Sequence, residues 1–147
     1  MVGTPFQTTE MLADELAFLT QFKPHMAGIG PFLPHRDTPF KDFGGGSVQT
    51  TLKMLALSRL LCPEILLPAT TALGTAAAGG RERGILAGAN VVMPNLSPAS
   101  CREKYSIYDN KLNTGAESSE GLAELAARMK KIGRVLATCR GDSLVKN

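Results

Sequence analysis

The chain has 147 residues, of which 44% are hydrophobic and 20% charged, and its formal net charge is +3. A chain of this length can bury a core as one domain. Its basic residues are scattered, without interleaved aromatic residues, which argues against binding to nucleic acid. No run approaches the roughly 18 consecutive apolar residues of a transmembrane helix, and the first residues lack the pattern of a signal peptide. We therefore expect a cytoplasmic protein that binds neither nucleic acid nor a membrane.

Three cysteines, Cys62, Cys101 and Cys139, lie far apart in the sequence. An odd number at such wide spacing is typical of neither a disulfide framework nor a metal-binding knuckle. His25 and His35 each stand beside a proline, without a carboxylate at metal-ligand spacing. The sequence alone therefore predicts no metal ligand and no catalytic residue.

Short apolar segments alternate with helical patterns over the first part of the chain. The predicted strands cover 1–3, 25–30, 65–67 and 90–93. The predicted helices run from Thr8 or Thr9 to about Phe22, from Ser47 to Pro63, from about Arg81 to Ala87, and from Ser97 or Pro98 to about 105–108. Apolar strands linked by helices predict an α/β protein with a parallel sheet. Four such units, the first of them truncated, correspond to half of a (β/α)8 barrel.

The pattern changes after Asp109, so we predict a barrel half at 1–109 and an extension at 110–147. A polar connector at 111–114 precedes a helix that Ser118 or Ser119 caps and Gly133 ends. Its apolar stripe consists of Leu122, Leu125, Ala126 and Met129. One last edge strand is predicted at 135–137.

The stretch from Pro24 to Phe40 has the most informative composition. A short apolar strand with two glycines is followed by a loop with prolines at 31, 34 and 39. Prolines fix φ, so this loop is predicted to be rigid. A rigid loop at the carboxyl end of a buried strand is where α/β folds bind their ligands.

This stretch resembles a segment of HydE, the radical S-adenosylmethionine (SAM) maturase of [FeFe] hydrogenase. Two further runs carry the same resemblance in the same order, Pro-Ala-Thr-Thr-Ala-Leu-Gly at 68–74 and Gly-Ala-Asn-Val-Val-Met-Pro-Asn at 88–95. The resemblance implies the C-terminal half of the family's barrel, ending in an extension of the biotin and thiamin synthesis-associated type.

The resemblance also implies an activity for the full-length family. Its members cleave SAM at a [4Fe–4S] cluster and act on a small sulfur-containing precursor of the hydrogenase H-cluster. The family holds that cluster with Cys-x3-Cys-x2-Cys, which is absent from this sequence. Asn113 stands where some members have a ligand of an accessory cluster. We therefore expect the chain by itself to hold no cluster and to be inactive.

Seven residues match the family's ligand contacts. The resemblance assigns SAM contacts to Met26, Met93, Tyr105 and Ile107, and the substrate chamber to Thr70, Thr71 and Tyr108. For the two methionines the alternative is a place in the apolar core. For the two threonines the alternative is a helix cap.

Two other classes of function stay open. One is a related radical SAM enzyme of the biotin synthase or methylornithine synthase type, and the Gly-Ile-Gly-Pro-Phe-Leu-Pro-His run at 28–35 favours HydE over these. The other is a non-catalytic half-barrel. Half of a barrel exposes two sheet edges, so we expect it to pair with the missing N-terminal half or with a second copy.

Overall fold

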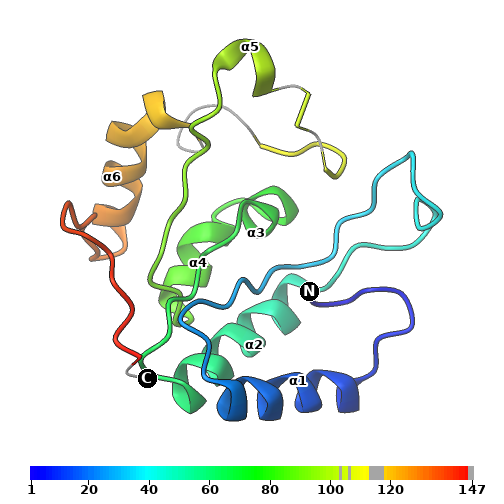
Figure 1. Cartoon of the computed structure of the whole chain (residues 1–147). Helices are drawn as coiled ribbons and strands as arrows, with labels where there is room; N and C mark the ends of the chain where they lie inside the picture. Colours follow the sequence, from blue (N-terminus) through cyan, green and yellow to red (C-terminus); the bar gives the residue numbers. More distant parts are fainter. Residues whose placement is uncertain (103, 106, 113–117, 146–147) are drawn as a thin grey trace.

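The computed structural model describes residues 1–102, 104–105, 107–112 and 118–145. Helices α1 and α2 lie next to each other, α3 and α4 form the centre, and α6 lies to one side (Figure 1). The helices are α1 (Thr9–Phe22), α2 (Val48–Leu61), α3 (Thr71–Ala76), α4 (Gly80–Leu86), α5 (Ala99–Arg102) and α6 (Leu122–Lys131), with the 3-10 helix η2 (Ser119–Gly121) preceding α6.

The two long helices begin and end where their capping residues predict. Thr8 caps α1 by accepting a hydrogen bond from the Met11 amide at 3.3 Å. Ser47 caps α2 in the same way through the Thr50 amide, at 3.2 Å. A side-chain oxygen at this position satisfies an amide that has no partner within the helix. The helices predicted near α4 and α6 are also confirmed, with bounds shifted by a few residues.

Two short helices differ from the sequence-based predictions. The helix expected from Ser97 or Pro98 to about 105–108 is only one turn long, Ala99–Arg102, within the described residues. Conversely, α3 forms in a stretch for which the sequence analysis predicted no helix. Both differences concern short helices, whose stability depends on packing rather than on propensity.

The prediction of a parallel sheet, and with it half of a (β/α)8 barrel, is wrong. In the part of the chain that the structure describes, the extended segments meet only at isolated parallel bridges and form no strand. The expected edge strand at 135–137 does not form either. The bridges join Val2 to Pro31, Met26 to Leu66, Ile29 to Ala69, Pro68 to Val91, and Asn95 to Ser118.

Proline interrupts the pairing of the segments at 25–30 and 65–69, which resumes at Ile29 and Ala69. The Leu66 amide donates to the His25 carbonyl, and the Ala27 amide donates to the Leu66 carbonyl, both at 3.0 Å. In a parallel ladder the next donor lies two residues further along the same strand. That residue is Pro68, which has no N–H. The pairing at Val2 ends for another reason, because the Phe32 carbonyl accepts from the Gly46 amide at 2.8 Å.

Side chains satisfy backbone groups that a sheet would otherwise pair. The Asn90 Oδ1 accepts from the Leu67 amide at 2.8 Å. Arg59, near the end of α2, donates from Nε to the Gly88 carbonyl and from Nη1 to the Ile65 carbonyl, each at 2.9 Å. The extended segments are therefore fixed against α2 by individual hydrogen bonds, since a buried carbonyl or amide without a partner is costly.

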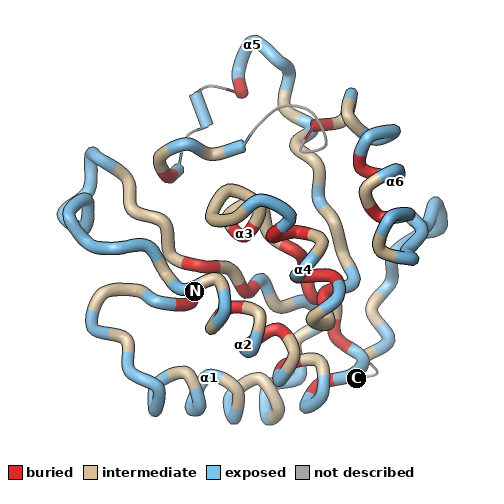
Figure 2. Tube along the Cα trace, turned by 180° about the vertical axis from the view of Figure 1, so that it is seen from behind, coloured by how far each residue is buried: buried red, intermediate tan, exposed pale blue. Residues whose placement is uncertain are grey.

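The core lies where α2, α3 and α4 meet the extended segments. Leu55, Leu67 and Leu73 are completely buried there. In Figure 2 the buried positions concentrate on these three helices and the neighbouring segments, whereas α1 shows none. The leucines that α1 presents to the core, Leu12, Leu16 and Leu19, are only partly buried.

Two ion pairs attach the later helices. Arg128 of α6 binds the Glu82 carboxylate of α4 through both Nε and Nη2, the latter at 3.0 Å. Arg102 of α5 donates from Nη2 to Glu120 of η2 at 2.8 Å and from Nε to the Ser97 carbonyl at 2.8 Å. Ion pairs that make two hydrogen bonds fix the orientation of one helix relative to another better than a single surface contact does.

Replacing Gly80 tests how closely α4 approaches α3. A Cβ at Gly80 would collide with the Leu73 carbonyl oxygen. We expect Gly80→Ala to lower the free energy of unfolding by about 1–3 kcal/mol, the usual cost of overpacking. This loss should occur although alanine forms helices better than glycine by roughly 1 kcal/mol. Urea unfolding measures the change, and Gly44→Ala, where no atom lies within 4 Å of the new Cβ, is the matched control. Equal stability of Gly80→Ala and the unmodified chain would contradict the packing.

The Arg102–Glu120 pair predicts a dependence of stability on pH. The hydrogen bond from Arg102 lowers the pKa of Glu120 from 4.5 to about 2. Because the pKa is lower in the folded state, the pair stabilises the fold above about pH 4.5 and its contribution is lost as the pH falls toward 2. Glu120→Gln removes this dependence, so its stability difference from the unmodified chain should shrink over that range. An NMR titration of the Glu120 carboxyl that gives an ordinary pKa would refute the pair.

Candidate functional site

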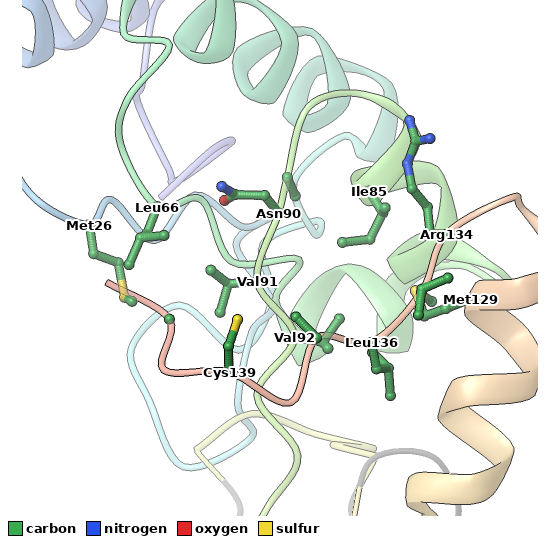
Figure 3. A pocket seen from close by; sticks show the side chains of 14 residues that line it. Met26, Leu66, Ile85, Asn90, Val91, Val92, Met129, Arg134, Leu136 and Cys139 are labelled. Atoms are coloured by element: carbon green, nitrogen blue, oxygen red, sulfur yellow. The ribbon is translucent and has the colours of Figure 1, made fainter. Parts of the chain in front are cut away.

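Two cavities flank the central extended segments. The first, which we call the tail cavity, has a volume of about 430 Å³ and lies beside residues 134–141. Figure 3 shows the C-terminal residues crossing it from Leu136 to Cys139, opposite Met26, Leu66 and Val91. Of the predicted SAM contacts, Met26 lines this cavity.

The second, which we call the loop cavity, has a volume of about 490 Å³. It lies between the proline-containing loop, the start of α3 and the segment at 107–108. Three of the predicted site residues, Thr70, Ile107 and Tyr108, line it together. Its walls are mostly apolar, and its lining consists of Met1, Gly28, Gly30, Pro31, Phe32, Leu33, His35, Thr38, Phe40, Thr70, Ala72, Ile107 and Tyr108.

Local hydrogen bonds bring the segment around Tyr108 to this cavity. The Asp109 amide donates to the Pro34 carbonyl at 3.2 Å, and the Asp109 carboxylate accepts from Arg36 Nε at 3.2 Å. On the other side, the Leu112 amide donates to Thr75 Oγ1 of α3 at 3.3 Å. The segment is thus attached both to the rigid loop and to a helix, and Tyr108 itself is buried.

A glycine allows the loop to approach α3. A Cβ at Gly30 would lie 2.6 Å from Thr70 Oγ1, closer than side chains tolerate. The backbone at position 30 therefore passes directly beside the threonine. Both residues line the loop cavity, so this contact forms part of its wall.

Both threonines have partners within the protein. Thr70 Oγ1 accepts from the Leu73 amide at 3.4 Å and caps α3, as the alternative interpretation predicted. Thr71 Oγ1 accepts from Nη2 of Arg81, a completely buried residue, at 3.3 Å. A hydroxyl has two lone pairs and one proton, so these bonds leave each threonine further capacity for a ligand.

The two methionines are not core residues. Met26 is 45% and Met93 58% exposed, so the alternative that both fill the core is wrong. Met93 and Tyr105 line neither of the two cavities. Tyr105 instead lies under Lys111, whose Nζ is 3.6 Å from the ring centroid and donates to the Tyr105 carbonyl at 3.1 Å. Burial lowers the pKa of Lys111.

The residues present do not fit an iron–sulfur cluster. Cys62 is buried, whereas Cys101 and Cys139 are exposed. Within the described residues, no three His, Cys, Asp or Glu side chains gather in a way that could hold a metal ion. Asn113 lies outside those residues. None of the described helices is long and apolar enough to span a membrane.

The sequence is similar to two kinds of known enzyme, although no family model matches it. It is 49% identical over 112 residues, 76% of the chain, to the [FeFe] hydrogenase maturase subunit HydE of Thermotoga maritima. It is 31% identical over 132 residues, 90% of the chain, to the 3-methylornithine synthase of Methanosarcina barkeri. The corresponding enzyme of Methanosarcina acetivorans is also 31% identical, over 75% of the chain.

These matches define the class of protein to which the chain is related. They cover 32%, 35% and 30% of the three enzymes, so the chain spans about a third of the length of the relatives it matches. The much higher identity to HydE confirms the resemblance that the three sequence motifs predicted. The chain is HydE-like.

Thr70 offers a test of its role as a cap. We expect Thr70→Val to lower the free energy of unfolding by about 0.5–2 kcal/mol, because the Leu73 amide loses its acceptor. Thr70→Ser keeps the hydroxyl and should retain most of the stability. Guanidinium unfolding measures both variants. If valine proves as stable as serine, the hydroxyl does not cap α3.

Proposed function

We propose that this chain supplies the ligand-binding part of a HydE-like radical SAM maturase of [FeFe] hydrogenase. In this proposal Met26, Met93, Tyr105 and Ile107 contact SAM. Thr70, Thr71 and Tyr108 line the chamber of a small sulfur-containing substrate. The observation that supports it is the 49% identity to HydE over 112 residues, a span that includes most of the chain.

In this proposal the substrate binds in the loop cavity. Its volume of about 490 Å³ lies within the range of small-molecule sites, and its few polar groups stand among apolar and aromatic walls. Ile107 of the proposed SAM set lines it beside Thr70 and Tyr108 of the proposed substrate set. One chamber would then hold the substrate next to SAM.

The proposed SAM contacts are divided between several places. Met26 lines the tail cavity, Ile107 lines the loop cavity, and Met93 and Tyr105 line neither. The described residues hold no ligand set for the family's [4Fe–4S] cluster, and Cys-x3-Cys-x2-Cys is absent from the sequence. We therefore propose that the chain acts together with the remaining two thirds of a HydE-like protein, in one polypeptide or as a separate partner.

A second candidate is a 3-methylornithine synthase-like enzyme. It is favoured by the longer match, which extends over 90% of the chain at 31% identity. In that case the same residues would bind SAM and a different small molecule.

A chimera distinguishes the two candidates. The matched segment of Thermotoga maritima HydE is replaced by the corresponding residues of this chain, and SAM cleavage and hydrogenase maturation are measured. We expect both activities to be retained, since half of the segment is identical. The same exchange is made in Methanosarcina barkeri 3-methylornithine synthase. Activity of that chimera alone would replace our proposal by the second candidate.

A matched variant tests the substrate chamber within the active chimera. Replacing Tyr108 by phenylalanine keeps the ring in its buried place and removes only the hydroxyl. If Tyr108 contacts the substrate, maturation should fall by about tenfold, the typical effect of one lost polar contact, while SAM cleavage changes little. An equal loss of both activities would assign Tyr108 a structural role.

A further inference from the structure

The C-terminal segment at 135–145, which we call the strap, crosses the body of the protein without a polar attachment. Within the described part of the chain, none of its residues makes a hydrogen bond or an ion pair with the body. Its polar contacts are internal, since Arg140 pairs with Asp142 at 2.9 Å and the Val145 amide donates to Ser143 Oγ at 3.2 Å. The strap can therefore leave the body without breaking a hydrogen bond to it.

Two apolar side chains attach the strap to the core. Leu136 packs against the core at one end and lies beside Met129 in the lining of the tail cavity (Figure 3). Val145 packs against the core at the other end, where it lines a cavity of about 150 Å³ together with Cys62. Both attachments are only partly buried, so each alone is weak. Two weak attachments on one short segment support each other, because the first keeps the second close to its place.

Between its two attachments the strap does not fill the space beneath it. The tail cavity, with its volume of about 430 Å³, separates the strap from the segments that carry Met26, Leu66 and Val91 (Figure 3). A chain segment that belonged to the core would leave no void of this size, because protein interiors are close-packed. The neighbours of the two attachments, Val135 and Leu144, are 90% and 70% exposed. The strap therefore covers the cavity and is not itself part of the core.

We propose that the strap is a movable cover of the tail cavity, which opens as one unit when Leu136 and Val145 leave the core together. The closed strap shields Met129 at one end and Cys62 at the other, residues that are only 2% and 8% exposed. The open strap gives access to the apolar walls of the cavity. Opening is a local equilibrium and leaves the helices folded. It depends only on contacts within this chain and does not require the proposed function.

A charge at either attachment should open the strap, because an unpaired carboxylate is costly to bury among apolar groups. The variants are Leu136→Asp and Val145→Asp in the whole chain. The readouts are the rate at which a maleimide labels Cys62 and the rate at which hydrogen peroxide oxidises Met129, both followed by mass spectrometry of peptides. We expect each variant to raise both rates by about tenfold, the effect of shifting a local equilibrium by one unfavourable burial.

Matched controls separate opening of the strap from the effect of the added charge. Val135→Asp and Leu144→Asp place the same charge one residue away, on exposed side chains, and should leave both rates unchanged. Urea unfolding of all four variants should give nearly the same midpoint as the unmodified chain, because only a local contact is lost.

The effect at the far end of the strap decides the test. Leu136→Asp must raise the labelling of Cys62, and Val145→Asp must raise the oxidation of Met129. If each variant changes only the residue at its own end, or neither rate changes, the strap does not open as one unit and the proposal is overturned. A large fall of the urea midpoint would place the segment in the core and would also overturn it, as would equal increases in the controls.

Discussion

The burial of Leu73 between two short helices is the constraint on which the site depends. Leu73 is completely inaccessible, and glycine allows α4 to approach it at two places. A Cβ at Gly84 would lie 2.8 Å from Leu73 Cδ2, and one at Gly80 would meet the Leu73 carbonyl. Leu73 belongs to α3 and packs against α4, and neither helix has the length to be stable alone, so each is stabilised by this contact. Thr70, which caps α3, is thereby held in place in the lining of the loop cavity.

The sequence predicts those elements whose cause is local. Thr8 and Ser47 begin helices because a side-chain oxygen three residues before an amide can cap it, whatever lies elsewhere in the chain. A sheet depends on pairs that are distant in sequence and on a donor at every second position. Pro68 occupies such a position, so the apolar segments at 25–30 and 65–69, which read as strands, meet only at isolated bridges. Pro68 was visible in the sequence, but the register that makes it decisive was not.

In the candidate site, too, the sequence indicates single residues but not the contacts between residues that are distant in the sequence. The motif at 68–74 indicated Thr70, and the structure brings it together with Ile107 and Tyr108. Their meeting depends on Asp109, which contacts Pro34 and Arg36 across the chain, and no pattern in the sequence indicates that contact. His35 was weighed only as a metal ligand. The His-Arg-Asp-Thr run at 35–38 carried a different signal, a turn in which the imidazole accepts a backbone amide.

The exposure of the proposed SAM contacts agrees with a site that other groups complete. Met26, Met93, Tyr105 and Ile107 are each between 45% and 59% exposed, although all four are large and mostly apolar. Such side chains gain free energy, about 25 cal/mol for each Å² of apolar surface, when something covers them. Within the described chain, the core is already filled by other residues, with Leu55, Leu67 and Leu73 leaving no accessible surface. A bound ligand or a further part of a HydE-like protein, as proposed above, would cover these side chains and give that free energy.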